Sequence, residues 1–260
     1  MDDFVGRHEP SPKALARWIA VLTLLTVIGG VYAQGYVAER LIVWRDAPAT
    51  AANILAHRNL YLSAVAVYLV EMAVSIASTV LFYPLMKPAG KTLSLVTLCL
   101  GLTANVIKTF GRVLFASPLY VLDTHRFHAV SPDVLNDLSL LLLLVNDHAA
   151  GIAMAFFGFQ ALLMGWLMLR ATFLPRVLGV LAILGGLGWS LHAWPPLGYK
   201  VNDYAMLVGV LGVLVQTFWF LIRGVNEQRW FEQAGVNGPT ARKATAVITD
   251  EARSPIPSSA

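Results

Sequence analysis

The sequence predicts an all-α membrane protein: a six-transmembrane-helix bundle with a long fourth helix and a disordered C-terminal tail. Hydrophobic residues make up 57% of the 260 residues and charged residues only 13%, whereas soluble domains carry about 45–50% and about 25%. Apolar runs of about 20 residues recur along the chain, and each can cross a hydrocarbon layer ~30 Å thick as a helix. A helix satisfies its own backbone hydrogen bonds and so needs no partner to span the bilayer.

Prolines and charged residues bound these apolar runs and divide the chain. We expect five spans near residues 17–36, 60–83, 92–115, 173–194 and 203–222, and a sixth, the fourth in chain order, that ends near Leu169. Residues 1–16 are then a cytoplasmic N-terminus and residues 17–224 form the six-helix transmembrane domain. Residues 225–260 are polar and lack apolar periodicity, which predicts a disordered cytoplasmic tail.

The fourth span is too long for the membrane. Ser131-Pro132-Asp133 is typical of a helix start, with an N-cap, a proline and an acid in the first turn. One helix from there to Leu169 would measure about 57 Å at ~1.5 Å per residue. Counted back from Arg170, the outer boundary falls near Asn146-Asp147-His148. We therefore expect residues 138–145 to project beyond the membrane or to bend over the bundle.

Lysine and arginine near the spans favour a multi-pass protein with both termini in the cytoplasm. The inner loops of that topology are short and contain almost no acidic residues, whereas the outer loops are longer and contain both signs of charge. The basic residues on the predicted inner side are Arg7, Lys13, Arg17, Lys87, Lys91, Arg170, Arg176, Arg223 and Arg229.

The first span has a second interpretation. Arg17, the apolar run from Trp18 and the small-residue site Val31-Tyr32-Ala33 also fit a cleaved signal peptide. The apolar stretch continues through Tyr36-Val37-Ala38, beyond that site. This continuation favours a span that is retained.

Polar side chains follow one face of the second span and one face of the third, because residues three and four apart share a helix face. A charge in hydrocarbon costs at least ~2.5 kcal/mol, so these faces should point into the bundle. On the second span they are Tyr61, Tyr68, Glu71, Ser75 and Ser78, and on the third Ser94, Thr97, Gly101, Asn105, Lys108 and Arg112. We predict an outward-opening polar pocket lined by Tyr68, Glu71, Asn105, Lys108, Arg112, Asp147, His148 and His192.

Structural roles compete with this interpretation. Glu71 and Lys108 could form a buried ion pair that only fixes helix register, and Arg112 with Asp147 a pair at the membrane interface. Histidines near an interface need no function. Gly151, Gly158 and Gly165 share one face of the fourth span and predict close helix packing.

Motifs for other chemistry are weak. Asp123, His125 and His128 are of metal-binding types, but their loop fixes no fourth ligand, so we expect no metal site and no cofactor. Cys99 is the one cysteine and excludes an intrachain disulfide. The basic residues lie between spans rather than in one patch, so we expect the bilayer and no nucleic acid as partner.

Three segments resemble a large bacterial family of integral-membrane proteins, the domain-of-unknown-function family 4386. They are Ala49–His57, Tyr83–Pro88 and Phe156–Trp189, and the third contains FLPRVLGVL, which joins two spans. The resemblance covers most of the chain from Arg17 to Arg223. It implies a bundle of about six helices in the bacterial plasma (inner) membrane. It implies no activity and transfers no catalytic residue.

Three functions remain open at this point. The convergence of polar faces favours a pocket for a lipid-like or small amphipathic ligand. If the pocket catalyses a reaction, Glu71 or Asp147 would be the acid or base, and Lys108 or Arg112 would hold an anionic group. The alternatives are an accessory or sensory membrane subunit without chemistry, and a small-molecule or proton-coupled transporter. The sequence leaves the oligomeric state and the enzyme question open.

Overall fold

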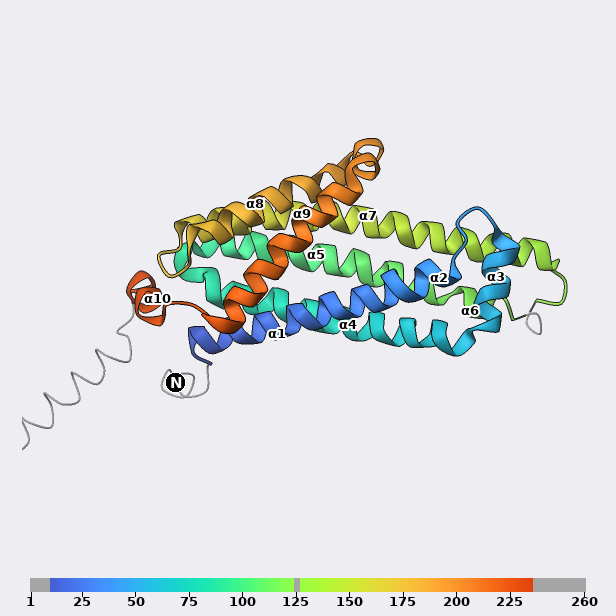
Figure 1. The fold of residues 1–260 in the computed structure, drawn as a ribbon, viewed down its shortest axis with the longest axis horizontal. Helices are drawn as coiled ribbons and strands as arrows, with labels where there is room; N and C mark the ends of the chain where they lie inside the picture. Colours follow the sequence, from blue (N-terminus) through green and yellow to red (C-terminus); the bar gives the residue numbers. More distant parts are fainter. Residues whose placement is uncertain (1–9, 124–126, 236–260) are drawn as a thin grey trace, which may run out of the picture.

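The computed structural model describes residues 10–123 and 127–235, which contain helices and no strand. Within these ranges six helices are long and apolar enough to cross a membrane (Figure 1). They confirm the predicted all-α membrane fold. In chain order the elements are α1 (Pro12–Gly30), η2 (Val31–Ala38), α2 (Glu39–Leu41), α3 (Ala47–Ala56), α4 (Arg58–Met86), η3 (Lys87–Ala89), α5 (Lys91–Ala116), α6 (Pro118–Val121), α7 (Pro132–Arg170), α8 (Arg176–Ser190), η4 (Leu191–Ala193), α9 (Pro195–Ile222) and α10 (Glu227–Ala234).

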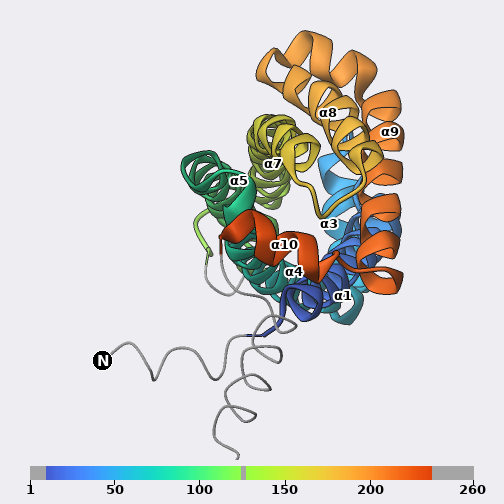
Figure 2. The same cartoon turned by 90° about the vertical axis from the view of Figure 1, so that its left-hand side faces the viewer.

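The long helices form a closed ring in chain order. Helix α1 packs against α4, α4 against α5, α5 against α7, α7 against α8 and α8 against α9. Helix α9 then returns to contact α1, as the end-on view in Figure 2 shows. We call the end that holds the start of α1, η3 and α10 the terminal end, and the end that holds α3 and α6 the distal end.

An apolar core closes each end of the ring. The terminal core draws on all of the long helices except α5, whose Leu93 packs against it from a partly buried position. The distal core draws on η2 and α2, on α3 and on the distal parts of α4, α5 and α7. The larger side chains of the terminal core are Leu15, Ile19, Leu85, Met86, Leu167, Phe173 and Phe220, and those of the distal core are Leu41, Ile54, Tyr61, Tyr68, Phe115 and Leu143.

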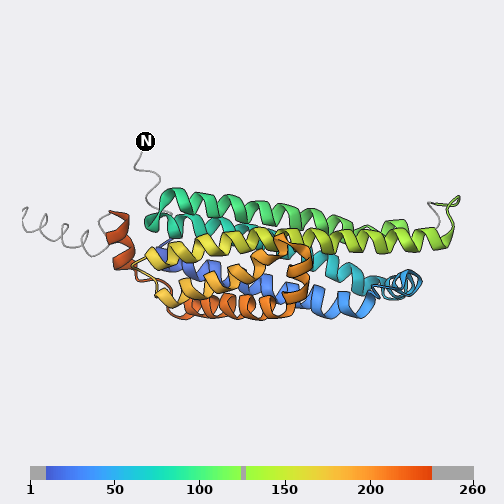
Figure 3. The ribbon, with the colours of Figure 1, turned by 90° about the horizontal axis from the view of Figure 1, so that it is seen from above.

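Helix α7 is a single helix of 39 residues, about 58 Å long at ~1.5 Å per residue. It begins after Ser131 as predicted. Of the two courses expected for residues 138–145, the structure has the straight one: the helix runs past the α8–α9 turn to the distal end (Figure 3). There Leu143 is fully buried in the distal core, and α3 and α6 pack against the same helix. The projecting segment is therefore part of the packed bundle.

Glycines let α7 approach α8 closely, as their common face predicted. A Cβ atom added to Gly158 would lie 2.3 Å from the backbone nitrogen of Ser190. One added to Gly165 would lie 2.6 Å from the carbonyl oxygen of Gly179. Both distances are far below van der Waals contact, so the two backbones touch only because these residues lack side chains.

The start of the predicted disordered tail, residues 225–260, needs correction. Residues 227–234 form α10, with the Asn226 side chain accepting from the Arg229 amide at 3.1 Å and Gly235 ending the helix at φ +68°. The helix is only eight residues long and polar on average, and it is held by contacts from far along the chain, so the composition of the segment did not reveal it. Residues 236–260, and with them the rest of that prediction, lie outside the described residues.

Helix α10 lies across the terminal end (Figure 2). Trp230 Nε1 donates to the Leu85 carbonyl at 2.8 Å, and Gln233 Nε2 donates to the Arg170 carbonyl at 3.2 Å. The Lys13 amide donates to Glu227 Oε1 at 3.3 Å. One short helix thus joins the ends of α1, α4 and α7.

We expect Trp230→Phe to loosen this connection. The change removes the hydrogen bond to Leu85 but keeps an aromatic ring, so the local loss should be about 1 kcal/mol. Hydrogen–deuterium exchange should then rise in residues 227–234 and in the loop at 171–175. Gln228→Ala, which loses only an exposed hydrogen bond to Glu232 of the same helix and no contact with another helix end, is the matched control. Unchanged exchange in Trp230→Phe would show that α10 does not depend on this contact.

Candidate functional site

Helices α4 and α5 bring their polar faces together at an ion pair. Lys108 Nζ donates to Glu71 Oε1 at 2.6 Å. The Glu71 side chain is 2% exposed and that of Lys108 22%. Gly29 and Gly30 of α1 lie against Glu71, since a Cβ on Gly30 would be 3.7 Å from Glu71 Oε1. The carboxylate is therefore enclosed by three helices.

Arg112 lies one helical turn from Lys108, towards the distal end. Its Cζ atom is 3.6 Å from the centroid of the Tyr68 ring, a close cation–π contact. Its Nη1 donates to Asn146 Oδ1 of α7 at 3.1 Å. The sequence suggested Asp147 of α7 as the partner of Arg112, whereas in the structure the partner is the preceding residue, Asn146.

Asn105 lies one turn from Lys108 in the opposite direction and is fully buried. Its Nδ2 donates to Thr79 Oγ1 at 3.1 Å and to the Gly101 carbonyl at 2.9 Å. These side chains form what we call the polar cluster: Tyr68, Glu71, Asn105, Lys108, Arg112 and Asn146.

Three buried atoms of the polar cluster have no hydrogen-bond partner among the described residues: Glu71 Oε2, Asn105 Oδ1 and Arg112 Nε. Two of them are acceptors and one is a donor. Buried polar atoms in proteins are nearly always hydrogen-bonded, so three exceptions in one cluster call for an explanation.

The π-helix η2 supplies a residue that sequence reasoning missed. Gln34 Oε1 accepts a hydrogen bond from the Tyr68 hydroxyl at 2.8 Å, so Tyr68 connects η2 to the rest of the polar cluster. A lone amide inside an apolar run was the available signal for Gln34. π-helical segments occur frequently at functional sites.

Three predicted lining residues lie elsewhere. Each residue turns an α-helix by about 100°, so Asn146 faces the interior while Asp147 and His148 are exposed. His192 is buried in η4, where Nδ1 lies 3.1 Å from the Trp189 carbonyl and Nε2 lies 3.2 Å from Asn202 Oδ1. Of the loop residues considered for a metal, His125 lies outside the described residues.

The distal core covers the polar cluster on the side where we expected an opening. The Phe115 ring lies 5.0 Å from that of Tyr68 and 4.8 Å from that of Tyr61, and the Tyr61 hydroxyl donates to the Phe115 carbonyl. Helix α3 packs over this region against α7. The structure brings together five of the predicted lining residues, Tyr68, Glu71, Asn105, Lys108 and Arg112. Lys108 is the most exposed of the five.

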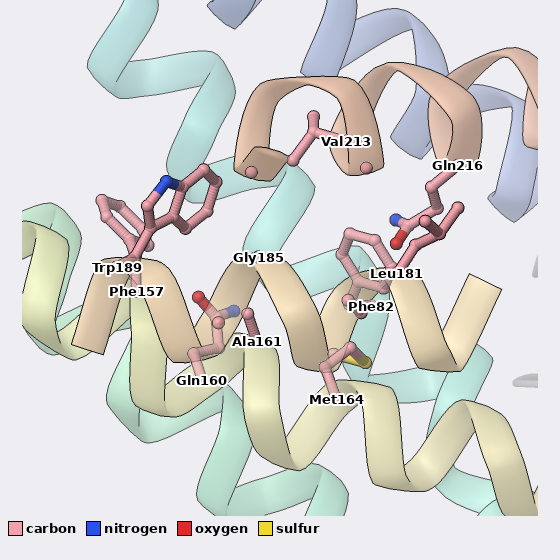
Figure 4. Close-up of a pocket in the computed structure, with 14 residues that line it drawn as sticks. Phe82, Phe157, Gln160, Ala161, Met164, Leu181, Gly185, Trp189, Val213 and Gln216 are labelled. Carbon is pink, nitrogen blue, oxygen red and sulfur yellow. The ribbon is translucent and has the colours of Figure 1, made fainter. Parts of the chain in front are cut away.

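A cavity of about 140 Å³ lies on the terminal side of the polar cluster, between α7, α8, α9 and Phe82 of α4 (Figure 4). None of the predicted site residues lines it. Glycines of α8 and α9 form part of its wall. Trp189 also lines the cavity, and its indole nitrogen has no hydrogen-bond partner among the described residues. The remaining lining is mostly apolar: Phe82, Phe157, Ala161, Met164, Leu181, Ala182 and Val213, with the amides of Gln160 and Gln216.

Six apolar helices around a buried polar cluster define a multi-pass membrane protein. The model of the family described as Domain of unknown function (DUF4386) matches residues 19–224. The chain belongs to this family, as the resemblance of its loop and helix segments implied. No curated protein and no solved structure matches the chain.

Proposed function

We propose that the protein binds a lipid-like or other small amphipathic molecule inside the membrane, with the polar cluster holding the polar group of the ligand. The observation that carries the proposal is the set of three buried atoms without partners, Glu71 Oε2, Asn105 Oδ1 and Arg112 Nε. A buried polar group left unsatisfied costs about 1–3 kcal/mol. A ligand that supplied the missing partners would recover that free energy on binding.

The chemistry of these atoms indicates the head group. Glu71 Oε2 and Asn105 Oδ1 accept hydrogen bonds, whereas Arg112 Nε donates one. The ammonium of Lys108 is already paired with Glu71, which makes a strongly anionic ligand a poor fit. A hydroxyl both donates and accepts, so a neutral head with two or more hydroxyls matches the cluster best.

The closed ends of the ring favour binding over transport. The terminal core is fully apolar, and the distal core covers the other side of the polar cluster. A transporter needs an alternating route to both sides of the membrane, whereas the two tyrosine hydroxyls of the distal core, those of Tyr61 and Tyr68, are already hydrogen-bonded within the bundle.

We further propose that the terminal end faces the cytoplasm of a bacterium, because Lys13, Lys87, Arg170 and Arg223 lie there. At ~1.5 Å per residue, Glu71 is about 22 Å from Met86 at the end of α4. In the proposed orientation, this depth would put the polar cluster in the outer half of a hydrocarbon layer ~30 Å thick. The partial exposure of Lys108 then favours ligand entry from the outer leaflet rather than from outside water.

The test is binding of a 1-monoacylglycerol to the full chain in phosphatidylcholine nanodiscs, measured by native mass spectrometry. The double variant Glu71→Gln/Lys108→Met removes the carboxylate and the cation together and leaves no lone buried charge. We expect it to bind at least about ten-fold more weakly, the equivalent of one lost hydrogen bond of about 1.4 kcal/mol.

Thr103→Ala is the control, because Thr103 lies on the exposed face of α5 and should bind as the wild type does. The proposal fails if the wild type takes up no monoacylglycerol, or if the double variant binds it with unchanged affinity.

A further inference from the structure

The cavity and the polar cluster share the same helix faces. On α4, Glu71, Ser75, Thr79 and Phe82 follow steps of four, four and three residues, so they lie along one face. Glu71 belongs to the polar cluster and Phe82 lines the cavity. The two are about 16 Å apart at ~1.5 Å per residue.

Helix α7 repeats this arrangement. Asn146, Ala153, Phe157 and Gln160 lie on one of its faces at steps of seven, four and three residues. Asn146 pairs with Arg112 in the polar cluster, whereas Phe157 and Gln160 line the cavity. Two helices thus lead from one feature to the other.

Gln160 lies where the two features meet. A Cβ on Gly101 would be 2.4 Å from Gln160 Nε2 and 2.7 Å from Thr79 Cγ2. Thr79 in turn accepts the hydrogen bond of Asn105. The Gln160 amide therefore packs on Gly101 beside Thr79, the hydrogen-bond partner of Asn105. Gln160 also forms part of the cavity wall (Figure 4).

We infer that this cavity receives the apolar end of the ligand, and that the ligand is a single-chain amphiphile whose chain extends from the polar cluster past Gln160. This inference rests on the proposed function. An engineered apolar cavity of about 150 Å³ takes up one benzene molecule. A cavity of about 140 Å³ accordingly accommodates the end of one acyl chain but has no room for two chains or a sterol.

The depth of the cavity makes the site selective for chain length. A chain that spans the roughly 16 Å from Glu71 to Phe82 places its end among the apolar side chains of α8 and α9. A short chain stops before Gln160 and gains nothing from the cavity. Affinity should therefore rise with chain length until the cavity is filled, because each added methylene makes van der Waals contacts with the cavity wall, although it gains no hydrophobic transfer from lipid.

The experiment compares octanoyl and palmitoyl 1-monoacylglycerol on the full chain in nanodiscs of one lipid composition, so that partition into the bilayer cancels between variants. Val213→Phe fills the cavity from α9 and should weaken palmitoyl binding about ten-fold relative to the wild type, while octanoyl binding stays unchanged. Val215→Phe is the matched control, since Val215 is 46% exposed on the same helix and should alter neither.

Leu181→Ala enlarges the same cavity and provides a change of opposite sign, which does not depend on Val213→Phe folding. Leu181→Ala should shift the binding preference of the protein towards monoacylglycerols with chains longer than palmitoyl. If both cavity variants keep the wild-type order of chain lengths, the cavity does not receive the chain and this inference is overturned, although the proposed function stands. If Glu71→Gln/Lys108→Met also binds every chain as the wild type does, the proposed function falls as well.

Discussion

Lys108→Met is expected to lower the free energy of unfolding by about 3–5 kcal/mol, the usual cost of breaking a buried ion pair by removing one partner. The Glu71 side chain is 2% exposed and lies 2.6 Å from the Lys108 ammonium. Without that ammonium the carboxylate is left as an unpaired charge among apolar helices. Most of the cost thus comes from the stranded carboxylate rather than from the lost attraction.

The measurement is unfolding of the detergent-solubilised protein, followed by circular dichroism as the denaturant concentration rises. Glu71→Gln/Lys108→Met should recover most of the stability, because it removes both charges at once. Lys91→Met, at the exposed start of α5, controls for loss of a lysine alone. A double variant that is no more stable than Lys108→Met would contradict the account of a stranded carboxylate.

Gly158→Ala and Gly165→Ala should each destabilise the fold by about 1–3 kcal/mol through overpacking. The new methyl group at Gly158 would lie 2.3 Å from the Ser190 nitrogen, and at Gly165 it would lie 2.6 Å from the Gly179 oxygen. Both obstacles are backbone atoms, which cannot rotate away as a side chain can. Helix α7 must then separate from α8, and the cavity wall moves with it.

Gly35→Ala is the control for these glycines, because a Cβ there meets no atom within 4 Å. Alanine is the better helix former by up to ~1 kcal/mol, so this change should be neutral or stabilising. Unfolding midpoints of the three variants test the contrast. Equal midpoints for Gly158→Ala and Gly35→Ala would show that α7 and α8 do not depend on backbone contact.

Composition and hydrophobic run length were sufficient to predict the membrane fold. The pairing of Glu71 with Lys108 was one of the alternatives that the sequence offered, because each lies on a polar face of adjacent helices and an unpaired charge is expensive there. The rotation of each helix about its own axis, which decides which residues face the interior, was harder to predict. Asn146, Asp147 and His148 are consecutive, and a register error of one residue turns the face by about 100°, so the polar triplet did not reveal which member points inwards.

Other parts of the candidate site depend on tertiary packing that leaves no local pattern. Gln34 is a single amide in an apolar run, and its role arises only when η2 brings it to Tyr68. The cavity is formed by side chains and glycines from four helices, none of which stands out in its own segment. Helix α10 is stabilised by partners as far away in the chain as Lys13 and Leu85.

Closure of the ring has a consequence for biogenesis. Helix α9 contacts both α8 and α1 and supplies Gly209, Val213 and Gln216 to the cavity wall. During synthesis α1 therefore stays in the bilayer with one flank exposed to lipid or to an insertase. That flank is covered only after α9, the sixth span, has left the ribosome. A chain terminated before residue 195 would insert five helices without the α9 wall of the cavity, and the uncovered flank of α1 would mark it for quality control in the cell.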